Sequence, residues 1–206
     1  MCPVLRRLAV VSWVASLLGL GACASTPSHF YVLNTLSASE TMPATAAAQS
    51  PVIGVGPITL PKYLDRPQIV TRVGRHQLAL GEFDRWAEPL QDNVLRVLAE
   101  NLALLIPTEQ ILLHPWPRSA TLDYQVSTEV LHFDGWLGGE STLLARWSIL
   151  DGAERELFTR LVDLHAPTGG QDYEAMVVAM NQLLEALSRD IATAIQRLAS
   201  RAVGRE

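Results

Sequence analysis

Cysteine is almost missing from this sequence. The 206 residues include only Cys2 and Cys23, so the chain beyond residue 23 contains no thiol. Disulfide bonds, a catalytic thiolate and cysteine-ligated metal sites are therefore excluded from that part of the chain. Its fold must be stable without covalent cross-links.

Sequence patterns of several enzyme classes are missing as well. The histidines, at positions 29, 76, 114, 132 and 165, lie in separate segments and none forms a His-x-x-x-His pair, so we predict no metal site. There is no Gly-x-Ser-x-Gly elbow and no Walker A motif, and "GVGP" at 54–57 lacks the helix that follows a dinucleotide loop. Two carboxylates could still meet in a cleft as acid and base, but we predict that the protein is not an enzyme.

The N-terminus has the pattern of a secretory signal. Arg6 and Arg7 precede an apolar stretch over residues 8–20, which is shorter than the roughly 20 residues of a spanning helix and suits the apolar region of a signal peptide. "LGAC" at 20–23 resembles a bacterial lipobox. We predict a lipoprotein signal peptide over residues 1–22 and a lipidated N-terminus and tether over 23–29, in preference to an N-terminal membrane helix.

The lipobox resemblance implies that Cys23 carries covalent diacylglycerol and an N-acyl lipid, such as palmitate, and we predict no other cofactor. Stable anchoring takes roughly two lipid chains, which this cysteine would supply. By the sorting rules of bacterial lipoproteins, Ala24 in place of Asp implies the periplasmic face of the outer membrane and makes the inner membrane the less favoured location.

Basic residues are outnumbered by acidic ones. The whole chain has a formal charge of −5, and loss of Arg6 and Arg7 with the signal would leave −7. No basic stripe suits nucleic acid, so we predict no nucleic-acid partner. An acidic body also has no general attraction to an anionic membrane, which leaves membrane attachment to the lipid.

The rest of the chain predicts one α+β domain over residues 30–206: a largely antiparallel sheet packed against two amphipathic helices. Alternating or apolar runs predict strands, and apolar residues at helical spacing predict a helix over 88–105 and a long one that Asp172 caps. The polar segment 37–50 reads as a flexible loop. The strands are expected at 30–33, 51–60, 69–73, 76–80, 109–113, 122–130, 142–150 and 154–164.

Three side chains are singled out for their surroundings. Trp86 leads into the first helix and is expected to anchor it against the sheet. His132 lies in phase with the apolar face of a strand and is expected to be a structural histidine. Trp136, in a Gly-rich turn, is compatible with local packing or with partner contact, because exposed aromatic residues often anchor interfaces.

Three segments together resemble a known family. They are "FYVL" at 30–33, "IGVGPITLPKYLDRPQIVTR" at 53–72 and "FDRWAEPL" at 83–90. They are similar to the ABC-type transport auxiliary lipoproteins, which include the lipoprotein of the paraquat-inducible (Pqi) intermembrane transport system. The resemblance implies a non-catalytic lipoprotein with MCE-domain proteins of a lipid transport system as partners, and association into a homo-oligomeric ring.

Two hypotheses follow for the function, with a third behind them. The first is a docking module that receives the periplasmic part of the transporter at the outer membrane. The second is a periplasmic lipid-binding carrier whose helices and sheet enclose an acyl cavity. The third is a periplasmic hydrolase.

Overall fold

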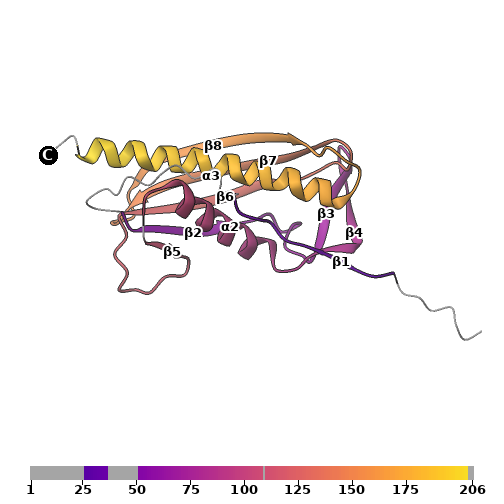
Figure 1. Ribbon diagram of the computed structural model, residues 1–206, viewed down its shortest axis with the longest axis horizontal. Helices are drawn as coiled ribbons and strands as arrows, with labels where there is room; N and C mark the ends of the chain where they lie inside the picture. The colour runs from indigo at the N-terminus through magenta and orange to yellow at the C-terminus, as the bar shows by residue number, and fades with distance from the viewer. Residues whose placement is uncertain (1–25, 37–50, 109, 204–206) are drawn as a thin grey trace, which may run out of the picture.

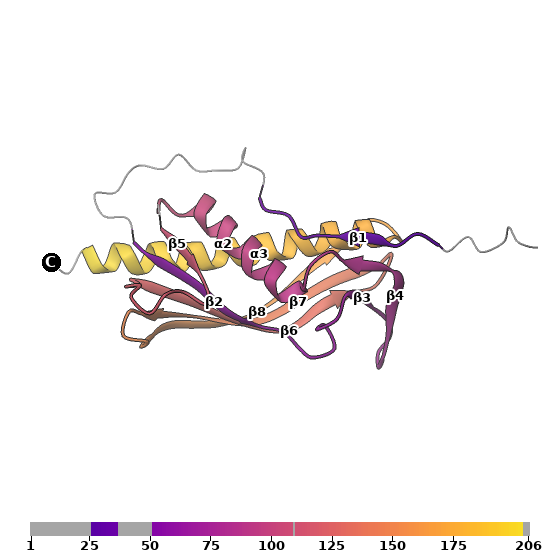
Figure 2. The same ribbon diagram turned by 90° about the horizontal axis from the view of Figure 1, so that it is seen from below.

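The computed structural model describes residues 26–36, 51–108 and 110–203. Within these ranges, two helices lie against one face of a curled eight-stranded sheet (Figures 1 and 2). The α+β prediction is confirmed. The predicted loop at 37–50 lies outside the described residues, as does Cys23.

The elements are β1 (His29–Tyr31), β2 (Ile53–Thr59), β3 (Gln68–Gly74), β4 (Gln77–Trp86), α2 (Leu90–Leu105), β5 (Ile111–Leu113), β6 (Tyr124–Gly135), β7 (Glu140–Asp151), β8 (Glu156–Pro167) and α3 (Tyr173–Val203).

The sheet is mixed, although its long pairings are antiparallel as predicted. β6 and β7 pair antiparallel from Tyr124 to Gly135, and β7 and β8 pair in the same way. The other edge of β6 is shared, because β2 runs parallel to its first half and β3 meets it only at Gly135. β5 extends the sheet beyond β2, while β4 and β1 extend it beyond β3.

The two helices follow the apolar spacing of the sequence. In α2 the side chains of Leu90, Val94, Val97, Leu98 and Leu102 are buried. Pro89 stands at the N-cap position, one residue before the helix, whereas the sequence predicted a start at residue 88. Pro89 has no N–H to donate, so it suits a helix start where N–H groups lack partners anyway.

The long helix α3 begins as predicted. Asp172 accepts a hydrogen bond from the backbone N–H of Ala175 at 2.7 Å, which satisfies one of the free donors of the first turn. Its apolar stripe faces the sheet and α2, and is buried at Met176, Val177, Met180, Leu183, Leu184, Leu187, Ile191 and Ile195. The stripe is therefore part of the core.

The segment after β1 is fastened to the helices by asparagine side chains. Asn93 accepts the backbone N–H of Leu33 at 2.7 Å, and Asn101 accepts that of Leu36 at 2.9 Å. Both asparagines are at most 1 % exposed, and Asn101 also donates to the Ser188 hydroxyl of α3. Since buried backbone N–H groups need partners, these contacts join the N-terminal segment to the core. We call residues 32–36 the N-terminal strap.

Candidate docking site at the two motif segments

Two segments that carried the family resemblance meet in space. Residues 60–67 connect β2 to β3, and residues 86–91 run from the end of β4 into α2. Together they line a pocket of about 320 Å³. Its lining residues are Leu60, Leu64, Asp65, Arg66, Pro67, Trp86, Ala87, Glu88, Pro89, Leu90 and Gln91. We call this the motif pocket.

Backbone hydrogen bonds hold the two segments together. The N–H of Leu64 donates to the carbonyl of Pro61 at 2.9 Å, which closes a turn. The N–H of Trp86 donates to the carbonyl of Pro67 at 2.7 Å, and this bond joins the segments directly. The side chain of Leu64 is 3 % exposed, so the turn is fixed to the core as well. The pocket therefore has firmly held walls.

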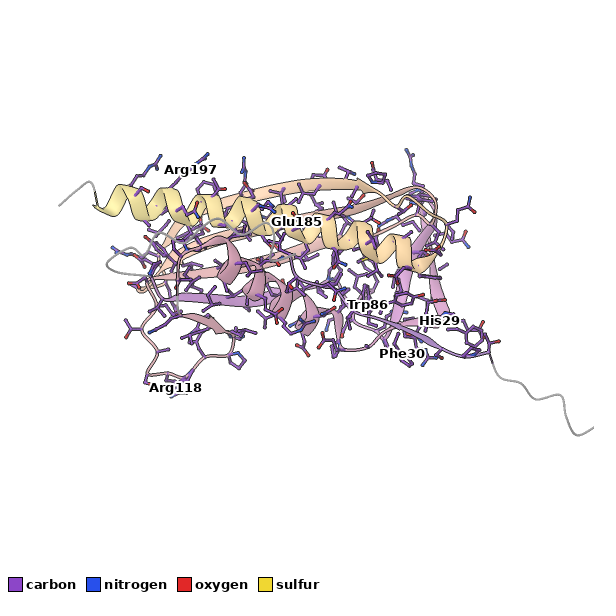
Figure 3. The ribbon with its side chains drawn as sticks, viewed as in Figure 1. His29, Phe30, Trp86, Arg118, Glu185 and Arg197 are labelled. Carbon is purple, nitrogen blue, oxygen red and sulfur yellow. The ribbon has the colours of Figure 1, made fainter. Side chains whose placement is uncertain are left out.

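Trp86 forms the inner wall of the motif pocket. Trp86 is 5 % exposed and belongs to the main hydrophobic cluster, which confirms its predicted role as a core anchor. β1 pairs with the end of β4 so that Tyr31 lies opposite Trp86, and the next N–H, of Ala87, donates to the Tyr31 carbonyl at 2.9 Å. The "FYVL" segment thus supports the same wall (Figure 3).

The rim of the motif pocket is polar and carries both signs of charge. Asp65, Arg66 and Gln91 are exposed. Glu88 is held in place, since its carboxylate accepts from Asn93 at 2.6 Å and from Arg96 at 3.0 Å. An apolar floor with a polar rim suits an apolar side chain flanked by polar groups, as at the centre of a protein interface.

A hydrogen bond to a buried carboxylate fixes the loop that lines this pocket. Asp134 of β6 is 1 % exposed, and it accepts from Arg72 Nε of β3 and from the hydroxyl of Tyr63, each at 2.5 Å. Burial and the hydrogen bond to Asp134 raise the pKa of Tyr63 above its usual value. His132 lies at the edge of the group, with Nδ1 3.4 Å from both the Tyr63 hydroxyl and an Arg72 nitrogen. His132 is half-buried beside polar partners, as expected of a structural histidine.

Sequence reasoning missed this cluster and the two asparagines of the strap. Tyr63 and Arg72 lie in the second family segment, but Asp134 is far away in sequence and only the β3–β6 contact brings it near. For Asn93 and Asn101 a signal existed, because both lie in line with buried Val97 at four-residue spacing. A polar residue within an apolar helix stripe indicates a hydrogen bond to another element.

The remaining singled-out residue, Trp136, is 39 % exposed in the turn between β6 and β7. Its neighbour Leu137 is 36 % exposed. Among the described residues, no group of three or more histidine, cysteine or acidic side chains converges on a point that could hold a metal ion. None of the helices in the described ranges is both long enough and apolar enough to span a membrane.

These features define a class of protein: a single α+β domain in which two segments of the family resemblance line one pocket. The model of the family described as the ABC-type transport auxiliary lipoprotein component matches residues 31–192. The chain belongs to this family, so it is a lipoprotein-type auxiliary component of a transport system. No curated protein matches the sequence.

Two of the solved structures that match, XCC0632 and an uncharacterized protein, share the fold at low sequence identity. Protein XCC0632 from Xanthomonas campestris is 15 % identical with a TM-score of 0.71, and the match covers 86 % of this chain and 99 % of that one. The crystal structure of an uncharacterized protein is 19 % identical with a TM-score of 0.68, covering 82 % and 99 %. PelC from Paraburkholderia phytofirmans, a dodecamer, has a TM-score of 0.42 at 11 % identity, covering 72 % and 92 %.

Proposed function

We propose that this chain is the non-catalytic outer-membrane docking component of an MCE-type intermembrane lipid transport system, such as the Pqi system. The family assignment supplies the transport context. The docking role is supported by one arrangement: residues 60–67 and 86–91 meet at one apolar pocket with a charged rim. The motif pocket receives an apolar side chain from the periplasmic end of the MCE protein.

The lipid on Cys23 has a direct part in this function. It confines the domain to a thin layer at the periplasmic face of the outer membrane. A partner that crosses the periplasm then meets the motif pocket at a raised effective concentration, which strengthens a weak contact without new interactions. The strap supports this role because it joins the tether to α2 through Leu33 and Leu36 and to α3 through Asn34.

Site-specific photo-crosslinking in the native envelope tests the proposal. A photoreactive residue replaces Gln91, which is exposed on the pocket rim. The matched control replaces Arg118, an exposed residue at the other end of the molecule (Figure 3). We expect a crosslink from position 91, and none from 118, to an MCE-domain protein identified by mass spectrometry. If neither position captures an MCE protein, the docking assignment fails while the fold and the family stand.

Association into a ring is part of the same proposal. β8 pairs only with β7 among the described strands, and Leu157 and Leu161 are 42 % and 55 % exposed along it. A long edge strand with apolar side chains is a ready surface for another chain. Mass photometry of the acylated protein in detergent measures the number of subunits, and a strictly monomeric species would contradict the ring.

A lipid-binding carrier is the alternative function, and the apolar lining of the motif pocket favours it. Pockets that hold small ligands measure about 300–1,000 Å³, so this pocket, at about 320 Å³, lies at the small end. The apolar stripes of both helices are already buried in the core, which favours docking over an enclosed acyl cavity. Lipid mass spectrometry on the Cys23→Ser protein separates the two functions, since a bound stoichiometric phospholipid would support the carrier.

A further inference from the structure

The β3–β4 hairpin exposes apolar side chains on both of its faces. Val73, Leu78 and Leu80 are 51 %, 38 % and 46 % exposed. In the register of the hairpin, Leu78 lies opposite Arg72 and Leu80 opposite Val70, so these two share one face, whereas Val73 lies between Arg72 and Gly74 on the other. A strand that packs on a core exposes one face only. This hairpin therefore extends beyond the core (Figure 2).

A second exposed apolar group lies next to the hairpin. β3 and β6 run parallel where Thr71 pairs with Gly135, so both strands continue in the same direction into their turns. The turn after β6 presents Trp136 and Leu137, which are 39 % and 36 % exposed. The hairpin and this turn lie at the same end of the molecule (Figures 1 and 2), and we call them together the end surface.

The N-terminal tether leaves from the same end of the molecule. β1 runs parallel to the last residues of β4, with His29 opposite Asp84, and His29 lies at the end of the molecule where β3 and β4 lie. Figures 1 and 3 show this arrangement, with Phe30, 64 % exposed, beside His29. Cys23 is six residues from His29, and an extended chain spans at most about 3.6 Å per residue. Acyl chains on Cys23 thus hold the body within about 20 Å of a bilayer.

The part of the hairpin that precedes Glu82 differs in charge from the whole chain. Residues 68–81 contain Arg72, Arg75 and His76 and no acidic residue, although the chain as a whole carries −5. Arg72 is engaged with Asp134, while Arg75 and His76 are exposed at the tip. Exposed apolar side chains beside cationic ones, with a tryptophan at the margin, are the composition of a surface that enters a lipid headgroup layer.

We propose that the end surface is a second membrane contact: the tip of the β3–β4 hairpin and Trp136 enter the headgroup layer of the bilayer that holds the acylated Cys23. This inference depends on the proposed acylation of Cys23. The domain then stands end-on at the membrane, and the motif pocket lies above the bilayer surface, where a partner reaches it. Trp136 contacts lipid in this arrangement and not the transport partner.

Fluorescence depth measurement tests the inference. After processing, the acylated chain has no free thiol, so Leu78→Cys can be labelled alone with an environment-sensitive fluorophore. Leu113→Cys on β5 is the matched control, because Leu113 is 44 % exposed and lies away from the tether end (Figure 1). Both acylated proteins are placed in vesicles of phosphatidylethanolamine and phosphatidylglycerol, with and without spin-labelled lipid. We expect a blue shift and loss of emission at position 78 and neither change at position 113.

Each other outcome contradicts the inference in a distinct way. Water-like emission at both positions, in protein that floats with the vesicles, means that Cys23 anchors the chain but the hairpin stays in solution. A blue shift at position 78 without quenching by spin-labelled lipid means that protein, not lipid, covers the hairpin. Equal quenching at both positions means that the domain lies flat. Protein that does not float at all refutes the acylation and the second contact together.

A charge variant gives a second measurement. Arg75 is exposed at the tip of the hairpin, so Arg75→Glu should fold normally. We expect Arg75→Glu to reduce the quenching of the label at position 78 when phosphatidylglycerol is present, because the tip then repels an anionic surface. Unchanged quenching would overturn the part of the inference that assigns the cationic tip to the headgroups.

Discussion

The carboxylate of Asp134 is the most consequential single group in the described structure. It is 1 % exposed and is neutralised by Arg72, whose side chain is 26 % exposed, with Tyr63 as a second donor. An ion removed from water is stable only if its partner and hydrogen bonds replace its hydration. These three residues come from β6, β3 and the loop of the motif pocket, so their contacts couple the pocket to the sheet.

Replacing Arg72 should therefore weaken the fold. Arg72→Leu leaves Asp134 buried without its cation, and we expect a loss of about 3–5 kcal/mol in the free energy of unfolding, measured by urea denaturation at neutral pH. The double variant Arg72→Leu/Asp134→Leu removes the buried unpaired carboxylate and should be more stable than the single variant. If Arg72→Leu unfolds at the same urea concentration as the wild type, water has access to Asp134 and the ion pair does not contribute to stability.

Tyr31 gives a prediction at high pH. Burial, together with the hydrogen bond to Asp84, raises its pKa from 10.0 to about 12. The folded chain therefore keeps the phenol proton where the unfolded chain loses it, so the stabilising effect is complete below pH 10 and is lost as pH rises towards about 12. The same direction holds for Tyr63, Tyr124 and Tyr173, in each case chiefly through burial.

Unfolding free energy measured at a series of alkaline pH values checks this prediction. We expect the stability of the wild type to fall across that window, and the fall to be shallower in Tyr31→Phe, which has no phenol to titrate. An identical slope in the variant would show that the hydroxyl of Tyr31 is as accessible in the folded chain as in the unfolded one.

At the scale of elements, the strap shows how an irregular segment becomes part of the core. Residues 32–36 form no strand, yet Leu33 is fully buried and Leu36 is 8 % exposed. Asn93 and Asn101 of α2 supply the acceptors that a neighbouring strand would otherwise supply. Because the proposed tether precedes β1 directly, a pull on the proposed lipid anchor would pass through β1 to these contacts.

Removal of either asparagine should loosen the strap. Asn93→Ala leaves the buried N–H of Leu33 without an acceptor, and we expect a cost of about 1–3 kcal/mol. Hydrogen exchange should speed up at Leu33 in this variant and at Leu36 in Asn101→Ala. Asn181→Ala is the control, because Asn181 accepts the N–H of Asn34 at an exposed position and its loss should cost little. Equal protection of Leu33 in the wild type and Asn93→Ala would contradict the role of Asn93.

At the scale of the whole molecule, the proposed anchor and the folded core are formed by different parts of the chain. The core is built from residues beyond the tether, beginning with Leu33, and it is formed by one sheet and two helices. The contacts proposed for function lie at the edge of this core, where Leu64, Trp86 and Leu90 line the motif pocket, and at the end surface. A change in the lipid anchor should therefore alter location and leave the fold intact.

Cys23→Ser tests this separation. The serine cannot be acylated, so we expect the protein to leave the membrane fraction while its melting temperature stays that of the wild type. The end surface alone gives only weak attachment, since stable anchoring takes roughly two lipid chains. Retention of the variant in membranes after a high-salt wash would mean that something other than the acyl chains holds the protein.

The sequence predicted every described strand and both helices, because period-two and helical apolar spacing report which face of a segment is buried. Boundaries were less certain: β6 continues to Gly135 and β4 to Trp86, beyond the predicted ends. Strand neighbours could not be predicted. The parallel pairing of β2 and β3 along one edge of β6 depends on long-range packing, and local patterning does not encode it.

The amino-acid sequence by itself determined the elements, the family and the expectation of a lipid anchor at Cys23, because propensity, periodicity and linear motifs are properties of neighbouring residues. Only the tertiary structure decided which distant residues meet. It brought residues 60–67 to 86–91 as the walls of the motif pocket, placed Asp134 against Arg72, and left the hairpin and the β6–β7 turn at the same end of the molecule (Figures 1 and 2). The physical reason is that the chain folds along the path that buries one continuous core. That path also determines which residues lie next to one another at the surface.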